Sequence, residues 1–97
     1  MTKPVTFPID GDLDLHTFRP EEVENLLDDY FSECLKKKIY SVRVVHGKGS
    51  GVLKKRVQAA LSKNPLIASF KDAPPSAGGW GATIVELARP PLNNKSR

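Results

Sequence analysis

Residues 42–54 have the sequence VRVVHGKGSGVLK, and this stretch decides the fold that we expect for the chain. A β-prone run ends at His46, three alternate glycines follow with Lys48 among them, and a helix-forming run begins at Val52. Glycines let a backbone approach a ligand closely with positive φ angles, and the N-terminal end of a helix favours an anion. The stretch therefore predicts a strand, a tight turn and a helix, in which the turn either binds phosphate or simply connects the two elements.

The glycine turn differs from the two familiar nucleotide-binding loops. A Walker-type loop needs Gly-Lys-Ser/Thr five residues after its first glycine, and counted from Gly47 this position is Val52. The dinucleotide-binding fingerprint GxGxxG would place its third glycine at the same Val52. Neither motif is present, so the turn alone indicates no particular nucleotide.

The size and composition of the chain indicate one small domain. A chain of 97 residues buries roughly 60–65% of its unfolded surface, which is enough for one hydrophobic core. No apolar run is long enough to predict a membrane span, and the first eight residues lack the apolar segment of a secretion signal. The single Cys34 excludes an internal disulfide and a cysteine-based zinc site, so we expect a cytoplasmic protein.

The charges are unevenly distributed, although the net charge is only +4. Residues 1–33 hold nine of the eleven acidic side chains, whereas residues 34–71 hold ten of the fifteen basic side chains and no acid. A basic middle around the glycine turn is typical of a protein that binds a polyanion. The alternative interpretation is an ordinary solvated surface with charges that complement helix ends.

Hydrophobic periodicity predicts four strands and two helices. The strands are expected over residues 9–16, 40–45, 66–70 and 82–87. The first helix should begin at Pro20 and the second at Val52, with Ser50 as its N-cap and a stop at Asn64 and Pro65. Residues 72–81 should form a flexible loop. We expect residues 1–8 to be a flexible arm, 9–88 to be the domain and 89–97 to be a disordered tail.

The apolar residues of both helices form stripes at helical spacing. Those of the first helix are Val23, Leu26, Leu27, Tyr30, Phe31, Cys34 and Leu35. Those of the second are Leu53, Val57, Ala60 and Leu61. Cys34 lies on a stripe, so we expect it to be a small core residue rather than a reactive thiol.

The element order β-α-β-α-β-β predicts a two-layer α/β sandwich with a mixed four-stranded sheet. A strand–helix–strand unit crosses over right-handedly, so the first two strands should be parallel. The last two should form an antiparallel pair. Both helices should then cover one face of the sheet and leave the other partly open.

Two histidines are expected to meet at one edge of this sheet. His16 follows the first strand and His46 ends the second, and the carboxyl ends of parallel strands share an edge where ligands bind. Asp14 should lie on the same side as His16. Two histidines could supply the general base and general acid of phosphodiester cleavage, although a histidine taken singly is more often structural. No HxxxH or cysteine spacing supports a metal site.

Three motifs resemble those of the Smr domain, the small MutS-related family. Leu13-Asp14-Leu15-His16 resembles the family's LDxH motif, His46-Gly47-Lys48-Gly49 its HGxG motif, and residues 78–83 its last glycine-rich segment. The likeness extends from about Ile9 to Leu87, in the family's order and spacing. One difference is Thr17, where many members have glycine after the LDxH histidine.

The resemblance implies a fold similar to the C-terminal domain of translation initiation factor three. It also implies nucleic-acid binding, with DNA-nicking or RNA-cleaving activity in several members. The LDxH motif is tied to cleavage in the family, which assigns that role to Asp14 and His16. The HGxG motif carries over to His46, Gly47 and Gly49. Some members are fused to MutS-like ATPase regions.

We therefore hypothesise an Smr-type domain that binds DNA or RNA, including branched or structured forms, and cleaves it as an endonuclease. The alternatives are a non-catalytic nucleic-acid- or ribosome-binding module and, less favoured, a small-anion binder. One histidine would take a proton from the attacking hydroxyl and the other would protonate the leaving oxygen. Asp14 would orient a histidine. The predicted catalytic residues are Asp14, His16 and His46.

The predicted binding residues surround the glycine turn, whose N–H groups would face the phosphate oxygens. They are Gly47, Lys48, Gly49, Ser50, Gly51, Lys54, Lys55, Arg56 and Trp80. Trp80 would stack on an unpaired base or cap the edge of the core. A divalent ion, Mg²⁺ or Mn²⁺, is the candidate cofactor, but no residues are assigned to bind it. The oligomeric state is left open.

Overall fold

The fold contains a four-stranded sheet and two helices, in the predicted order. A computed structural model of the chain describes residues 9–49 and 51–89. The strands are β1 (Asp12–Asp14), β2 (Ser41–Val45), β3 (Ile67–Asp72) and β4 (Ala82–Leu87). The helices are α1 (Val23–Lys36) and α2 (Val52–Lys63). Short 3-10 turns are η1 (Pro20–Glu22), η2 (Pro75–Ala77) and η3 (Gly79–Gly81). The arm over residues 1–8 and nearly all of the predicted tail lie outside the described residues.

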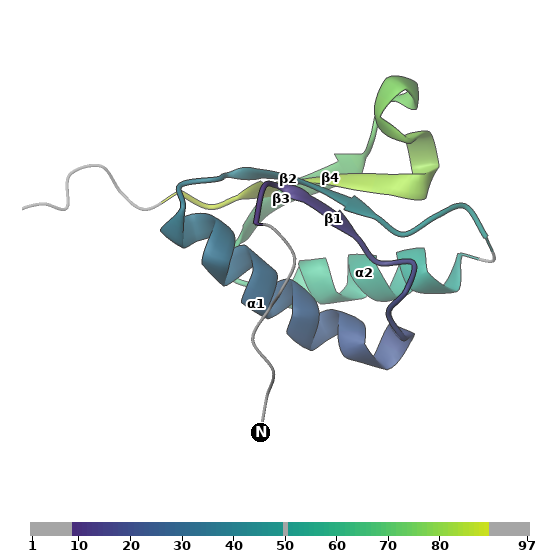
Figure 1. Cartoon of the computed structure of the whole chain (residues 1–97), viewed down its shortest axis with the longest axis horizontal. Helices are drawn as coiled ribbons and strands as arrows, with labels where there is room; N and C mark the ends of the chain where they lie inside the picture. Colours follow the sequence, from purple (N-terminus) through teal and green to yellow (C-terminus); the bar gives the residue numbers. More distant parts are fainter. Residues whose placement is uncertain (1–8, 50, 90–97) are drawn as a thin grey trace, which may run out of the picture.

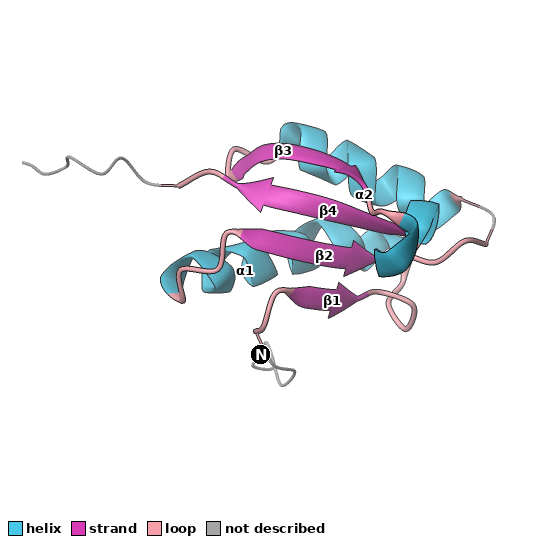
Figure 2. Cartoon of the chain, turned by 90° about the horizontal axis from the view of Figure 1, so that it is seen from above, coloured by secondary structure: helices cyan, strands magenta, loops and turns pink. Residues whose placement is uncertain are grey.

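The order of strands in the sheet is β1-β2-β4-β3. β1 and β2 are parallel, with Asp14 beside Val45, and β4 is antiparallel to both β2 and β3. Figure 2 shows the arrows of β1 and β2 pointing the same way while β4 lies between β2 and β3. The predicted mixed sheet is thus confirmed, and its centre is formed by β2 and β4.

Both helices lie on the same side of the sheet (Figure 1), which confirms the two-layer sandwich. The segment that contains η2 and η3 rises on the other side (Figure 1). This segment was expected to be a loop without regular structure. Its 3-10 turns are instead held by backbone hydrogen bonds, such as that from the Gly79 N–H to the Pro74 carbonyl at 3.0 Å.

Several predicted boundaries were wrong by a few residues. The first strand covers Asp12–Asp14 rather than residues 9–16. Its start is delayed because Gly11 has a φ of 89°, which interrupts the extended conformation. Pro20 begins a 3-10 turn rather than the α-helix itself, which starts at Val23. β3 continues to Asp72 because its pairing with β4 persists to Thr83.

The core lies between the sheet and the two helices. It contains Leu13 and Leu15 from the β1 region and most of the predicted stripes of α1 and α2. In the α2 stripe, Leu53 is only half-buried. Two residues of the α1 stripe, Leu26 and Leu35, are only half-buried, because they lie at its margin. Burial raises the pKa of the Cys34 thiol to about 11, as expected for a core residue that is not a reactive thiol.

Tyr30 connects α1 to the beginning of β1. Its ring is buried in the core, and its hydroxyl accepts a hydrogen bond from the Gly11 N–H at 3.0 Å. A buried hydroxyl needs such a partner, since leaving it unpaired is costly. The bond supports the chain at Gly11, directly before the strand that carries Asp14.

We expect Leu27→Ala to lower the free energy of unfolding by about 2–5 kcal/mol, because Leu27 is 1% exposed and its removal leaves a cavity. Chemical denaturation measures this loss. Leu26→Ala is the matched control and should cost less, since Leu26 is half-buried. Equal losses for the two variants would contradict the helix orientation described here.

Candidate functional site

Asp14 and His16 form an exposed pair at the carboxyl end of β1. The Asp14 carboxylate oxygen Oδ1 lies 2.8 Å from His16 Nδ1 and accepts a 3.0 Å hydrogen bond from the His16 backbone N–H. These two bonds, the backbone one first, lower the pKa of Asp14 below its ordinary value. Because an ionised carboxylate only accepts hydrogen bonds, Nδ1 carries the proton and Nε2 is the nitrogen left for another partner.

The alternation of β1 places this pair outside the core. Leu13 and Leu15 point inward and are buried, so Asp14 and His16 point outward. Their side chains are 55% and 72% exposed. They line a hollow of about 350 Å³ together with Asp10, Asp12, Leu13, Thr17 and Phe18. The pair that the sequence predicted is therefore assembled and accessible.

His46 has the opposite environment, because it is 6% exposed. Its Nε2 lies 2.8 Å from the buried hydroxyl of Thr83, and its Nδ1 lies 3.3 Å from the Gly47 carbonyl oxygen. A carbonyl can only accept, so Nδ1 donates and the neutral ring accepts at Nε2 from Thr83. Burial, followed by the nearby charge of Lys54, lowers the pKa of His46. The ring is thus held neutral with both nitrogens engaged.

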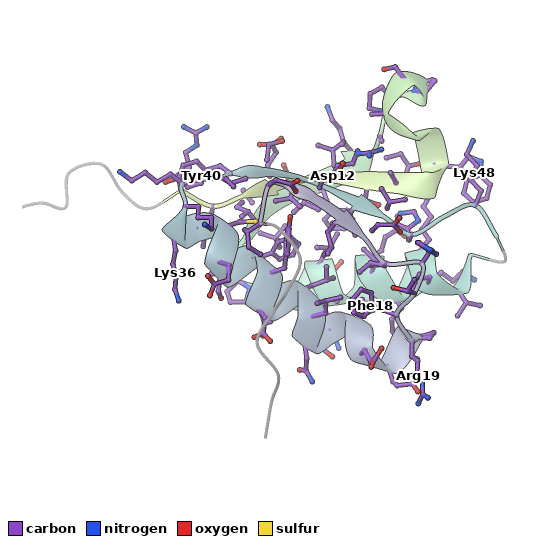
Figure 3. The ribbon with its side chains drawn as sticks, in the orientation of Figure 1. Asp12, Phe18, Arg19, Lys36, Tyr40 and Lys48 are labelled. Atoms are coloured by element: carbon purple, nitrogen blue, oxygen red, sulfur yellow. The ribbon has the colours of Figure 1, made fainter. Side chains whose placement is uncertain are left out.

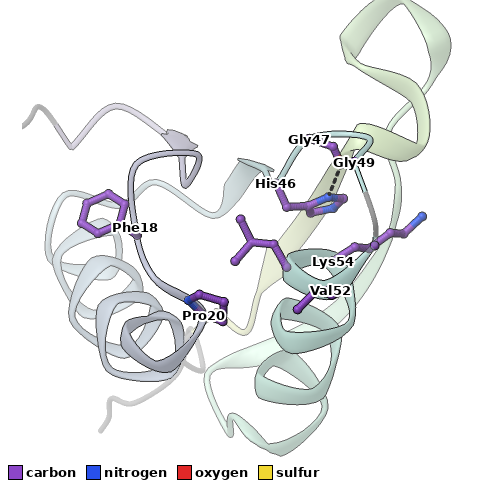
Figure 4. A pocket seen from close by; sticks show the side chains of 9 residues that line it. Phe18, Pro20, His46, Gly47, Gly49, Val52 and Lys54 are labelled. Atoms are coloured by element: carbon purple, nitrogen blue, oxygen red, sulfur yellow. Dashed lines mark hydrogen bonds between the residues drawn. The ribbon is translucent and has the colours of Figure 1, made fainter.

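The two histidines occupy the predicted sheet edge but line different hollows. His16 lines the acidic hollow described above, whereas His46 lines a second one of about 250 Å³ (Figure 4). Phe18 borders both. The second hollow is formed by Phe18, Pro20, His46, Gly47, Gly49, Gly51, Val52, Leu53 and Lys54. The parallel strands bring the histidines to one edge, and β4 then buries only His46.

The glycine turn is anchored to the end of η3, directly before β4, through one backbone carbonyl. The oxygen of Gly81 accepts hydrogen bonds from the N–H groups of His46 and Gly47 at 3.0 and 2.8 Å. A Cβ on Gly81 would lie 2.8 Å from Lys48 Cγ, so a side chain there would displace the lysine. Gly81 and Thr83 were not predicted as site residues. The repeated glycines around Trp80 were the available signal for Gly81.

Positive φ angles at Gly47 (83°) and Gly51 (86°) shape the turn. Gly51 rather than Ser50 occupies the N-cap position of α2, and its carbonyl accepts the Lys55 N–H at 3.0 Å. The predicted N-cap was therefore wrong by one residue, because the left-handed glycine starts the helix without a side-chain cap. Ser50 lies outside the described residues. Gly49 has open space where a Cβ would be.

Two of the basic residues near the turn have internal partners. Lys54 Nζ lies 3.1 Å from Asp72 Oδ1 and 5.3 Å from the centre of the Trp80 ring. Arg43 donates from Nε and Nη2 to the Asp12 carboxylate and from Nη1 to the Ala77 carbonyl, each at 3.0 Å. Arg43 therefore connects β1, β2 and η2, and neither cation is fully available to a polyanion.

The other predicted basic binding residues and Trp80 are exposed. Lys48 lies at the turn end of the molecule (Figure 3), with its stem along Gly81. Lys55 and Arg56 lie in the first half of α2, and Trp80 is 46% exposed on η3. The structure thus brings Lys48, Lys54 and Trp80 to the same end of the sheet, where β2 and β4 meet the turn.

Within residues 9–49 and 51–89, no group of three or more His, Cys, Asp or Glu side chains could hold a metal ion. The described residues therefore assign no position to Mg²⁺ or Mn²⁺. No helix in this part of the chain is both long and apolar enough to cross a membrane.

The fold and these motifs define a small two-layer α/β domain with an aspartate–histidine pair and a glycine turn at one sheet edge. A model of the Smr domain matches residues 13–88, and the chain belongs to the Smr domain family. The resemblance found from the motifs is thereby confirmed.

The relatives of this chain include proteins named Endonuclease MutS2. The chain is 42% identical over 76 residues to Endonuclease MutS2 of Staphylococcus carnosus and 44% identical over 75 residues to that of Helicobacter pylori. These matches cover 78% and 77% of this chain but 10% of each relative. The chain thus spans about a tenth of the length of these relatives.

Two solved structures have a similar fold. The Smr domain of Thermus thermophilus MutS2 superposes with a TM-score of 0.77 at 33% identity, covering 81% of this chain and 99% of that one. YdaL, a stand-alone small MutS-related protein from Escherichia coli, has a TM-score of 0.75 over 81% of this chain and 65% of its own. Its 24% identity shows likeness of fold alone.

The environment of His46 predicts a pH dependence of stability. Because its pKa is lowered by folding, the unfolded chain binds more protons than the folded chain just below pH 6.5, the ordinary value. The contribution of neutral His46 to the free energy of unfolding should be complete above this pH. It should be lost as the pH falls through the lowered pKa of the folded state. Urea denaturation at several pH values measures the change.

His46→Gln is the control for this prediction, because glutamine does not titrate. The part of the pH dependence that belongs to residue 46 should disappear in this variant. A parent protein and a variant that lose stability in parallel between neutral and mildly acidic pH would contradict the role given to His46.

Proposed function

We propose that this domain binds nucleic acid beside the glycine turn and cleaves a phosphodiester bond at the Asp14–His16 pair. The observation that carries the proposal is the 2.8 Å contact between Asp14 Oδ1 and His16 Nδ1 on an exposed strand end. Membership of the Smr family and likeness to proteins named Endonuclease MutS2 support it. DNA and RNA, including branched or structured forms, are the proposed substrates.

His16 is the proposed general base. The Asp14 carboxylate holds Nδ1–H and directs Nε2 to the substrate, where it would take the proton of the attacking hydroxyl. The charge of Asp14 would stabilise the imidazolium that forms. The same histidine, once protonated, could return its proton to the leaving oxygen.

His46 is proposed to position the turn rather than transfer protons. The sequence-based hypothesis gave His46 the second proton-transfer role, but its ring is buried and both nitrogens face groups of this chain. Through Thr83 it ties the beginning of the turn to β4. The N–H groups of the turn and the ammonium of Lys48 would then face the phosphate.

A non-catalytic binding module, including one that binds a ribosome, is the second candidate. One observation favours it: His16 is the single exposed histidine among the described residues, so only one imidazole there can exchange protons with a substrate. Cleavage tests on supercoiled plasmid and structured RNA, with EDTA and with added Mg²⁺ or Mn²⁺, separate the two candidates.

We expect binding of duplex DNA to weaken as salt is added. Lys48, Lys55 and Arg56 are the exposed cations beside the turn, and three neutralised phosphates give a slope of log K against log[salt] of roughly −3. Lys48→Ala should reduce the slope by about 1. Lys63→Ala, at the far end of α2, is the matched control. A slope near zero for the parent protein would show that these cations do not contact the phosphates of the duplex.

We expect His16→Ala to reduce cleavage by about 10²-fold or more, because a general base contributes about 10²–10⁴-fold. Asp14→Asn should also reduce the rate, since it removes the charge that stabilises the imidazolium. Gel analysis of nicked plasmid and cleaved RNA measures both effects, with nucleic-acid affinity recorded in parallel.

Asp10→Asn is the matched control for Asp14→Asn. It removes the same charge from the same hollow. The Asp10 carboxylate, however, accepts a hydrogen bond from the Asp12 N–H, whereas the Asp14 carboxylate contacts His16. Its cleavage rate should stay close to that of the parent protein. If His16→Ala, equally stable, cuts as fast as the parent protein, the proposed catalytic pair is incorrect.

A further inference from the structure

Two large apolar side chains stay exposed among residues 9–49 and 51–89, and both border the glycine turn. Val52 is 56% exposed at the beginning of α2, and Trp80 is 46% exposed on η3. Elsewhere in the described chain, large apolar side chains are buried or half-buried. Neither is a lone apolar residue on a plain surface, because Val52 lines a hollow and Trp80 lies beside the Lys54 ammonium.

The hollow beside Val52 has the size and lining for one flat apolar group. Its volume is about 250 Å³, whereas pockets for drug-sized ligands measure about 300–1,000 Å³. Pro20, from the segment that follows β1, lies across from Val52 of α2 (Figure 4), and Phe18 and Leu53 also line the hollow. The backbone of the glycine turn and the buried ring of His46 complete the lining. A single nucleobase matches these properties.

Trp80 provides a second apolar surface, and its ring is already held in place. The Lys54 ammonium lies 5.3 Å from the ring centre, and its nitrogen lies 3.1 Å from Asp72 Oδ1. Lys54 also lines the hollow, so its side chain connects the two apolar surfaces. A ring that is ordered before binding loses little conformational freedom when a base stacks on it.

A cation lies beside the same segment. The stem of Lys48 passes along Gly81, and its ammonium would lie 3.9 Å from a Cβ built on Gly79, next to Trp80 in the chain. The end of the molecule therefore carries an apolar hollow, an exposed aromatic ring and an exposed ammonium close to that ring. A nucleic-acid strand carries the groups that these features fit, because its bases have apolar faces and its phosphates are anionic.

We propose that this end of the molecule binds a single-stranded segment, with one base in the hollow, a neighbouring base on Trp80 and phosphate at Lys48. The proposal rests on the proposed function and narrows its substrate class to nucleic acid with unpaired bases. In a duplex the faces of the bases are stacked on one another. A base would therefore have to unstack before it could enter the hollow or stack on Trp80.

The test uses three probes of equal length: a single-stranded oligothymidylate, the same strand with every base removed, and a duplex. The abasic strand keeps the backbone charge, so it separates base binding from phosphate binding. Trp80 is the only tryptophan, which makes its fluorescence a direct report on this site. We expect the strand with bases to quench the fluorescence of Trp80. Its affinity per binding site should be higher than that of the abasic strand and higher than that of the duplex.

Three variants and a matched control locate the contact. Trp80→Ala should weaken single-strand binding by about 5- to 150-fold, the range for one stacked base, while Trp80→Phe should retain most of it. Val52→Ser should weaken it several-fold and leave duplex binding unchanged. Tyr40→Ala is the control, because Tyr40 also has a cation above its ring, Arg89 at 4.7 Å, but lies at the opposite end from Lys48 (Figure 3).

Equal affinity for the strands with and without bases, at unchanged Trp80 fluorescence, would overturn this inference. The proposed function would survive that result if binding of the three probes remained sensitive to salt. Absence of binding to every probe at low salt would instead overturn the proposed function, and this inference with it.

Discussion

The carbonyl oxygen of Gly81 accepts hydrogen bonds from two consecutive N–H groups, those of His46 and Gly47, at 3.0 and 2.8 Å. These bonds form because β4 pairs with β2 as well as with β3, its neighbour in the sequence. They hold the glycine turn against the segment that carries Trp80, although more than thirty residues separate the two. If β4 lay at the edge of the sheet beyond β3, the turn and Trp80 would be far apart, and the surfaces at this end of the molecule would not exist.

The central position of β4 also separates the roles of the two histidines. His46 lies where β2 and β4 are paired, so Thr83 of β4 meets its ring and burial keeps it neutral. His16 follows β1, an edge strand with no neighbour on its other side in the described sheet, and it stays exposed with Asp14. A group that exchanges protons with a substrate needs access to it, which His16 has. The buried ring instead stabilises the shape of the turn.

The basic side chains are also divided between two roles, because some are paired within the domain and others stay exposed. The basic middle of the chain is evident in the sequence, yet Arg43 and Lys54 each meet a carboxylate, Asp12 and Asp72, in the folded domain. Their charges serve mainly to connect elements: Arg43 joins two strands to η2, and Lys54 holds the Trp80 ring. Ion pairs of this kind contribute little free energy when exposed, but they orient the groups that they join. The cations left for a polyanion are fewer than the sequence indicates.

The sequence by itself determined the element order, the two-layer architecture, the placement of Asp14 and His16 on one side of the sheet and the family, because these depend on local periodicity and short motifs. Alternation of apolar and polar residues from Leu13 to His16 is enough to place both side chains outside the core. That Asp14 bonds His16 rather than His46 was shown by the structure. The sequence did not show that Gly51 starts α2, that Gly81 anchors the turn or that Thr83 engages His46. Those features were decided only by the tertiary structure, because they depend on β4 lying between β2 and β3, a choice made by long-range pairing and burial rather than by any local pattern.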